Sequence, residues 1–348
     1  MQIKCKDIKN NLINILKNIE LKKYTRREIN FFKNKTILIT GVSGIIGLNL
    51  LFFFYKLNVE KKNKIIIEAT FNKYLFDFIK TYFKKNKKIK FQKIDLSINK
   101  INKKKKFDLI FHCAGYGQPA KFLREKSATY KLNSKTIMDL TQNLKKEGKL
   151  VYMSTTEIYS GNNKICTELS TGKTSTQHPR STYIESKKFG ESFIINCVNK
   201  FLIFRVCLAY GPGAKLDDER VINQVILRSI RNENIDVYGG LNQLRSNLYI
   251  EDVIGFMIKA IVRSSNEIFN INNHSMTTLG KIFLLLSKIA NKKLINHVSK
   301  INGSPKIIRI SNKKIREITK YKISTNIKQG LLKTINWYSN LLKLNKEI

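Results

Sequence analysis

From residue 35 onward, short apolar runs rich in β-branched residues alternate with longer segments whose apolar residues recur every three or four positions. The short runs predict strands at 36–40, 65–67, 89–94, 107–111, 150–153 and 201–206. The longer segments predict helices at 45–57, 74–83, 126–146 and 183–199. Strands that alternate with helices are typical of a parallel sheet covered on both faces, so we expect an α/β fold with a Rossmann-like, doubly wound parallel sheet.

The two ends of the chain depart from this alternation. Residues 1–34 hold Ile8, Leu12 and Ile19 at helical spacing, which predicts an amphipathic helical extension that carries no recognisable chemistry. After Gly213 the pattern becomes irregular, as expected for a smaller lobe that shapes a pocket. We therefore expect a Rossmann domain over 35–210 with a return at about 241–262, and a substrate-binding lobe over most of 211–348.

The charge of the chain is its one extreme property. The 348 residues carry 65 basic and 25 acidic side chains, for a net charge of +40. A basic protein that binds nucleic acid through a dinucleotide-binding fold is therefore one hypothesis. The other is a general drift toward Lys, Asn and Ile. Lys far outnumbers Arg and forms runs in predicted loops, such as 103–106, and this favours drift because readers of bases and phosphates are more often Arg.

The cysteines and the apolar segments narrow the class of protein further. Five cysteines are scattered along the chain without a C-x-x-C pair, so we expect neither a disulfide framework nor a metal site. We also expect no membrane segment, because no apolar stretch approaches the roughly 18 residues that a spanning helix needs. A reducing cytoplasm fits this composition best.

A glycine-rich turn joins the first predicted strand to the first helix of the sheet. Gly41, Gly44 and Gly47 form a G-x-x-G-x-x-G pattern, and Ile45 and Ile46 stand at the start of the helix. Glycines allow a tight turn and a close backbone approach, so a pyrophosphate can rest on the amides at the helix N-terminus. This pattern predicts a dinucleotide site.

Polar and small residues after the next strands fit the same ligand. Glu68, which we expect to close the second strand, can bind a ribose 2′-hydroxyl and repel a 2′-phosphate, which favours NAD over NADP. Asp95 and Leu96 follow the third strand and suit either an adenine contact or a simple strand cap. Ala114 follows the fourth strand, where a small residue leaves room for the dinucleotide, and the neighbouring His112 is expected to be structural.

A tyrosine and a lysine four residues apart begin the helix predicted at 183–199. Tyr183 and Lys187 share one face of that helix and can point into one site. A free tyrosine, with a pKa of about 10, is a poor base at neutral pH. A nearby ammonium and a cationic nicotinamide both favour the phenolate, and this makes general-base catalysis feasible. The hydroxyl cluster Ser154–Thr156, with Glu157, ends the fifth strand and is expected to lie beside them.

In this order, the motifs resemble the extended short-chain dehydrogenase/reductase superfamily, or NAD-dependent epimerase/dehydratase family, of nucleotide-sugar enzymes. Residues 178–188 are similar to the P-R-x-x-Y-x-E-x-K-R stretch of UDP-glucuronate decarboxylases, which stand near the nucleotide-sugar 4,6-dehydratases. Further segments that resemble the decarboxylases are Glu219–Asn223, Asp236–Gly239 and Gln243–Arg245.

The resemblance implies a role for each residue of the chemical end. Thr155 would bind the sugar 4-hydroxyl, Tyr183 would take its proton while C4 passes hydride to NAD, and Lys187 would hold the ribose and the phenolate. Thr156 stands where the 4,6-dehydratases have an aspartate that protonates the leaving hydroxyl. A threonine hydroxyl is too weak an acid for that task. A threonine at this position, followed by Glu157 as the base at C5, favours decarboxylation. Dehydration or epimerisation is the alternative.

The resemblance also implies contacts to the substrate and a quaternary structure. Arg245, and with it Arg180 and Arg220, would bind the nucleotide-sugar substrate, since guanidinium groups pair bidentately with phosphate and carboxylate. Asn133 would support the nicotinamide end, and a homodimer would form through the helices that precede and include Tyr183. Leu208 replaces an asparagine of the relatives, and the loop 116–119 differs from the decarboxylase loop, so the sugar or nucleotide can differ as well.

Overall fold

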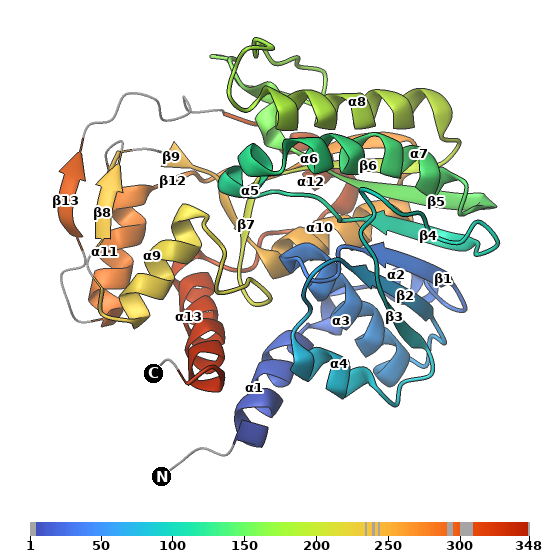
Figure 1. The fold of residues 1–348 in the computed structure, drawn as a ribbon, viewed down its shortest axis with the longest axis horizontal. Coiled ribbons are helices and arrows are strands. Elements are labelled where there is room, and N and C mark those ends of the chain that lie inside the picture. The colour runs from blue at the N-terminus through green and yellow to red at the C-terminus, as the bar shows by residue number, and fades with distance from the viewer. Residues whose placement is uncertain are drawn as a thin grey trace.

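The computed structural model describes residues 5–233, 235–238, 241–242, 244–290, 295–299 and 309–346 of the chain. Its centre is a parallel sheet of seven strands in the order β3-β2-β1-β4-β5-β6-β11 (Figure 1). The strands are β1 (Thr36–Thr40), β2 (Ile66–Phe71), β3 (Ile89–Lys93), β4 (Phe107–His112), β5 (Leu144–Thr155), β6 (Phe201–Val206) and β11 (Glu267–Ile271). The expected doubly wound sheet is therefore confirmed, and β11 adds a strand that was not predicted.

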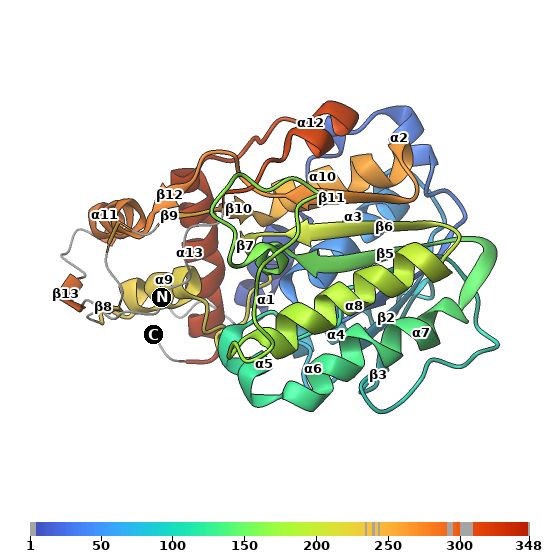
Figure 2. The same cartoon turned by 90° about the horizontal axis from the view of Figure 1, so that it is seen from above.

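Alternate residues of the central strands pack into two separate cores. Ile37 and Ile39 of β1 belong to one apolar cluster, and Leu38 between them belongs to the other. A strand buried on both faces reads as an unbroken apolar run, which explains the pattern in the sequence. Helices cover both faces of the sheet (Figure 2). They are α3 (Ile45–Glu60), α4 (Asp77–Phe83), α5 (Pro119–Arg124), α6 (Lys126–Asn133), α7 (Lys135–Thr141), α8 (Ser181–Cys197) and α10 (Ile250–Arg263).

The single helix predicted over 126–146 is wrong in detail. The chain breaks between α6 and α7 at Ser134, whose φ of −127° and ψ of −87° are not helical. It then enters β5 already at Leu144. Apolar periodicity runs through the break, so the pattern alone could not reveal it.

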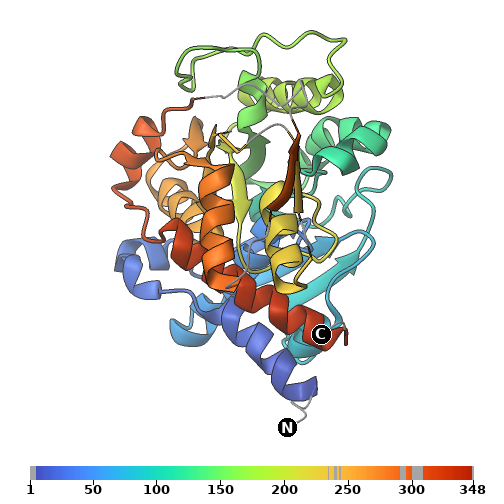
Figure 3. The same ribbon diagram turned by 90° about the vertical axis from the view of Figure 1, so that its left-hand side faces the viewer.

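A smaller lobe stands beyond the carboxyl ends of β5 and β6 (Figure 2) and faces the viewer in Figure 3. Its helices are α9 (Val221–Ile230), α11 (Leu279–Ala290) and α13 (Ile327–Leu344), whereas α12 (Lys313–Thr319) packs against α10 and β11 of the main body. Its short sheets pair β7 (Leu208–Tyr210) with β10 (Asn247–Tyr249), β9 (Leu244–Arg245) with β12 (Thr277–Thr278), and β8 (Ile235–Tyr238) with β13 (Ile295–Ser299). The chain returns to the main sheet through α10 and then β11, so the return runs further than the expected 241–262.

The N-terminal extension is fixed to the body of the protein, although its first four residues lie outside the described ones. It forms α1 (Cys5–Lys17), a 3₁₀ turn (Leu21–Lys23) and α2 (Arg26–Asn30), and α1 lies against α13 and α3. Glu28 is buried and pairs with Lys259 at 3.0 Å and Arg263 at 2.8 Å on α10. No helix among the described residues is long and apolar enough to cross a bilayer.

Candidate active site

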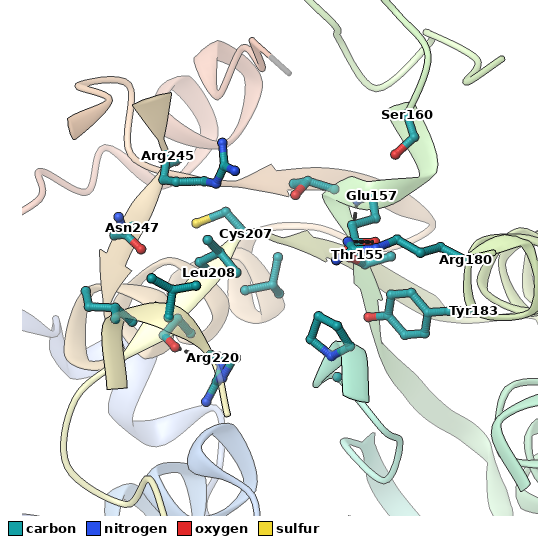
Figure 4. A pocket seen from close by; sticks show the side chains of 18 of the residues that line it. Thr155, Glu157, Ser160, Arg180, Tyr183, Cys207, Leu208, Arg220, Arg245 and Asn247 are labelled. Atoms are coloured by element: carbon teal, nitrogen blue, oxygen red, sulfur yellow. Dashed lines mark hydrogen bonds and ion pairs between the residues drawn. The ribbon is translucent and has the colours of Figure 1, made fainter. Parts of the chain in front are cut away.

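A cavity of about 1210 Å³ lies between the carboxyl ends of β5 and β6 and the smaller lobe. Thr155, Glu157 and Tyr183 line its sheet side, and Arg220 and Arg245 line the opposite wall (Figure 4). The cavity thus collects side chains from segments that lie far apart in the sequence. This is the usual place for a ligand in an open α/β sheet.

The glycine turn has the shape that a dinucleotide pyrophosphate requires. Gly41 has φ of +68°, and a Cβ there would come within 2.7 Å of the backbone of Ala114. Helix α3 begins at Ile45 after Gly44, with no side chain capping its first amides, and Ile45 and Ile46 face the cavity. Gly47 is close-packed as well, since a Cβ would meet the carbonyl of Gly41 at 2.6 Å. The turn therefore fits the backbone cradle expected for NAD.

The carboxyl end of β4 contributes the small residue and the structural histidine that the sequence predicts. Ala114 lies against Gly41 and donates its backbone amide to Thr40 Oγ1 at 3.1 Å. His112 is buried between Thr40 Oγ1 at 2.9 Å and the Leu132 carbonyl at 2.8 Å. Burial lowers the pKa of His112 to about 4, against the opposing effect of that carbonyl. The imidazole is therefore neutral and structural at pH 7.

Glu68 does not close β2, and the expectation that it binds the ribose is wrong. The strand continues to Phe71, and Glu68 is paired with Leu38 in the middle of the sheet. Its carboxylate is held by Lys105 at 2.7 Å. The apolar triplet 65–67 suggested an early strand end, but the sheet also buries Ala69 and Thr70.

Asp95 acts as a cap at the end of β3, one of the two roles that the sequence left open. Its carboxylate accepts hydrogen bonds from the backbone and hydroxyl of Ser97, at 2.9 and 2.7 Å, and from the Asn72 amide at 3.0 Å. Burial opposes these hydrogen bonds, but they hold the pKa of Asp95 below its usual range. Leu96 is buried, and its carbonyl accepts from Thr136 Oγ1.

The structure brings together the three residues on which the chemical hypothesis depends. Thr155 ends β5, while Tyr183 and Lys187 lie one turn apart on α8, and all three line the cavity. The Lys187 ammonium lies 5.9 Å from the centroid of the Tyr183 ring and donates to the Met153 carbonyl at 2.6 Å. The phenol, the hydroxyl and the amine therefore converge, as the motif spacing predicts.

The protein alone does not favour the phenolate of Tyr183. Burial and the negative charge of Glu157 raise the pKa of Tyr183, and the neighbouring Thr155 hydroxyl acts against them. Burial lowers the pKa of Lys187 to about 7, while Glu191 acts in the opposite direction. Against burial, Thr155, Arg220 and Arg180 act to lower the pKa of Tyr183, and the positive charge of a bound ligand would lower it further.

Phe122 supports the tyrosine, although no motif in the sequence marks it. Its ring stacks on the Tyr183 ring with centroids 4.4 Å apart and planes 3° from parallel. The Arg180 guanidinium also packs on Phe122, 5.7 Å from the centroid of its ring. The stack leaves Tyr183 few alternative orientations, because aromatic rings pack as rigid plates.

Glu157 and Arg180 form an ion pair at the mouth of the site. Arg180 Nη1 donates to Glu157 Oε2 at 2.9 Å, and about a quarter of each side chain is exposed. The Glu157 backbone amide also donates to Thr155 Oγ1 at 3.2 Å. Thr156 follows Thr155 in the same turn and lines the cavity.

The other two predicted arginines face the cavity in different states. Arg220 is bidentate to Asp218, with Nη2 2.5 Å from Oδ2, and donates to the Ala209 carbonyl. Arg245 is half-buried, and burial together with the positive charge of Arg180 lowers its pKa. Arg180 and Arg245 both line the cavity, so each can contact an anionic group of a ligand bound there.

Asn133 lies behind the site rather than in its wall. It is fully buried and donates to Ser186 Oγ at 3.0 Å, while its oxygen accepts from Tyr152 at 3.3 Å. A Cβ on Gly115 would stand 3.9 Å from that oxygen. Asn133 therefore links α6 to α8, beneath the part of the site where we expect the nicotinamide to bind.

A buried polar network under the cavity escaped the sequence analysis. Glu191 binds Arg205 through both carboxylate oxygens and accepts a short hydrogen bond from Ser154. Arg205 continues to the Tyr159 hydroxyl at 2.6 Å. Glu191 follows Tyr183 and Lys187 at the same spacing of four, and Arg205 is a lone charge in an apolar strand; both were available signals.

Two further positions bear on what the cavity can bind. Leu208 lines it where the resemblance expected asparagine, and Asn247 lies beside Leu208 in the paired strand β10. The Asn247 amide nitrogen is buried and has no hydrogen-bond partner among the described residues, so it can donate to a ligand. Gly239 and Gln243 of the predicted motifs lie outside those residues.

The chain is similar to several known proteins. The NAD dependent epimerase/dehydratase family matches residues 37–272. UDP-glucuronic acid decarboxylase 1 of Danio rerio is 23% identical over 68% of this chain, which spans 58% of that protein. UDP-glucuronic acid decarboxylase 6 of Arabidopsis thaliana is 24% identical over 88% of this chain and 89% of its own. The UDP-glucuronic acid 4-epimerase of Bacillus cereus, solved with UDP-glucuronic acid and NAD, has a TM-score of 0.73, 20% identity and coverage of 88% and 99%.

Proposed function

Because the chain belongs to the NAD-dependent epimerase/dehydratase family, we propose that it oxidises a nucleotide-linked uronic acid at C4 and then decarboxylates it. The observation that carries this proposal is that Arg180 and Arg245 line the same cavity as Tyr183. The substrate would bring a diphosphate and a C6 carboxylate, and both fit guanidinium partners.

The residues would divide the work as follows. Thr155 and Tyr183 hold the sugar 4-hydroxyl, and Tyr183 accepts its proton while Lys187 balances the charge that develops. NAD supplies the acceptor for the hydride that leaves C4. The 4-ketone makes the C6 carboxylate a β-keto acid, so the C5–C6 bond breaks, carbon dioxide leaves and the electron pair stays on C5. Glu157 would then donate a proton to C5. The hydride would return to C4 while Tyr183 gives back its proton, so the product is lighter by one carbon dioxide.

Thr156 distinguishes this reaction from its closest alternative. Loss of water from C6 needs an acid that protonates the departing hydroxyl, and a threonine hydroxyl is too weak for that role. Loss of carbon dioxide needs no such acid. Epimerisation at C4 remains the second candidate, because it requires only Thr155, Tyr183 and Lys187, which the site holds together.

The proposal is tested by incubating the protein and NAD with a panel of nucleotide sugars and weighing the products by mass spectrometry. A loss of 44 mass units indicates carbon dioxide and supports the proposal, while a loss of 18 indicates water. If the mass is unchanged, NMR of the product shows whether the configuration at C4 has been inverted. The absence of turnover on every nucleotide uronic acid would contradict the proposed substrate class.

Glu157→Gln is expected to separate oxidation from decarboxylation. The amide keeps the size of Glu157 and a contact to Arg180 but cannot deliver a proton to C5, so formation of the decarboxylated product should fall about 100-fold. C4 oxidation should continue, and NADH should accumulate at 340 nm. Glu185→Gln, which removes a carboxylate paired with Lys188 on the outside of α8, is the matched control. Equal loss of both steps would make Glu157 a positioning partner of Arg180 only.

We also propose that two copies of the chain associate through α6, α7 and α8. Exposed apolar side chains on these helices are Tyr130, Met138, Phe189 and Ile195. Sedimentation should give twice the mass of one chain, and Phe189→Lys should shift it toward one, because a charge then faces the apolar contact. Leu332→Lys, at an equally exposed site on α13, should leave the dimer intact. A wild-type monomer would contradict the proposal.

A further inference from the structure

The end of β2 determines which side chain meets the adenosine ribose of the dinucleotide. The Val42 amide, in the glycine turn, donates to the Thr70 carbonyl at 2.8 Å, so the residues after Thr70 stand beside that turn. Phe71 is buried in the apolar core, and Asn72 is therefore the first polar side chain at this edge. Dinucleotide-binding folds that select NAD usually place a carboxylate here, bound to the ribose 2′-hydroxyl.

No other described carboxylate can take that place. Glu68 lies in the middle of the strand and is held by Lys105. Asp95 uses one oxygen for Ser97 and the other for the Asn72 amide nitrogen. The Asn72 amide oxygen has no hydrogen-bond partner among the described residues, and Lys73, next in the chain, is exposed.

We infer that Asn72 replaces the usual carboxylate at the adenosine ribose, and that the site therefore accepts NADP as well as NAD. The amide oxygen of Asn72 can accept from a 2′-hydroxyl, as a carboxylate does, but carries no charge of its own that repels a 2′-phosphate. The neighbouring Asp95 carboxylate is bound by Ser97 and by the Asn72 amide, and the charge of Lys73 offsets it in part. Lys73 adds a cation that a phosphate can pair with. This inference rests on the family's use of NAD and not on the proposed reaction.

The experiment is isothermal titration of the full-length chain, freed of any bound nucleotide, with NAD+ and with NADP+. We expect dissociation constants that agree within about ten-fold, and NADP+ binding that weakens with salt more steeply than NAD+ binding. Asn72→Asp should weaken NADP+ at least about ten-fold and leave NAD+ within about three-fold, because a carboxylate then faces the 2′-phosphate. Lys73→Ala should weaken NADP+ alone.

Asn340→Asp makes the same chemical change on the exposed face of α13 and should alter neither constant. Wild-type protein that binds NAD+ more than about 100-fold tighter than NADP+ would overturn the inference. So would an Asn72→Asp variant with unchanged preference, or a protein that binds neither dinucleotide. Binding requires no sugar, so these results are independent of whether the chain decarboxylates a uronic acid.

Discussion

Tyr183→Phe should lower turnover of the nucleotide sugar by about 10²–10⁴-fold, the range expected when a general acid–base group is removed. The substitution deletes one hydroxyl and keeps the ring that stacks on Phe122 at 4.4 Å. The fold and the dinucleotide cradle should therefore survive. Tyr183 lines the cavity together with Thr155 and Lys187, and its phenol interacts with the Thr155 hydroxyl.

The electrostatics of the site explain why the effect should be large. Burial and Glu157 raise the pKa of Tyr183, so at pH 7 the free protein holds it as the neutral phenol. Burial also lowers the pKa of Lys187 to about 7, so the amine exchanges a proton near neutral pH. Phenylalanine has no proton to accept or return.

The measurement is turnover by mass spectrometry, together with NAD+ affinity by titration. Tyr130→Phe, which removes a hydroxyl from the exposed face of α6, is the matched control and should keep full activity. Unchanged activity in Tyr183→Phe would contradict the catalytic role. If the variant instead retained binding to nucleic acid that weakens steeply with salt, the hypothesis of a basic nucleic-acid-binding protein would gain support.

The parts of the structure that the sequence predicted are those set by local pattern. Strands such as β1 and β6 are buried on both faces, so an apolar run of the right length identifies them without knowledge of their neighbours. The glycine turn and the spacing of Tyr183 and Lys187 are local in the same sense. Each puts its functional atoms in place by backbone geometry alone, and these atoms do meet in the structure.

The parts that escaped depend on pairing between distant segments. Glu68 was assigned to a strand end because the apolar run stops there, yet the length of β2 is set by its ladder to β1 and β3, which continues to Phe71. The contact between Glu157 and Arg180 joins a turn after β5 to the start of α8 across 23 positions. The role of a charged side chain inside a fold depends on the residue that it pairs with, and the pattern of a single sequence does not identify that residue.

The network under the cavity provides the largest expected effect on stability. Arg205→Ala should lower the free energy of unfolding by about 3–5 kcal/mol, because it leaves Glu191 buried without its counter-charge. Arg205 and Glu191 have only 8% and 6% of their side chains exposed. The arginine also donates to the Tyr159 hydroxyl and the Glu168 carbonyl, so the segment that follows Thr155 loses its attachment to β6.

Urea unfolding of the full-length chain measures this effect. Lys200→Ala, which breaks an exposed pair with Glu147, should cost no more than about 1 kcal/mol. A second variant separates the charge from the packing: Arg205→Met combined with Glu191→Leu should recover much of the lost stability, since no buried charge is left unpaired. If the double variant were less stable than Arg205→Ala, the ion pair itself would stabilise this part of the protein. The cost of leaving the Glu191 carboxylate unpaired would then not explain the effect.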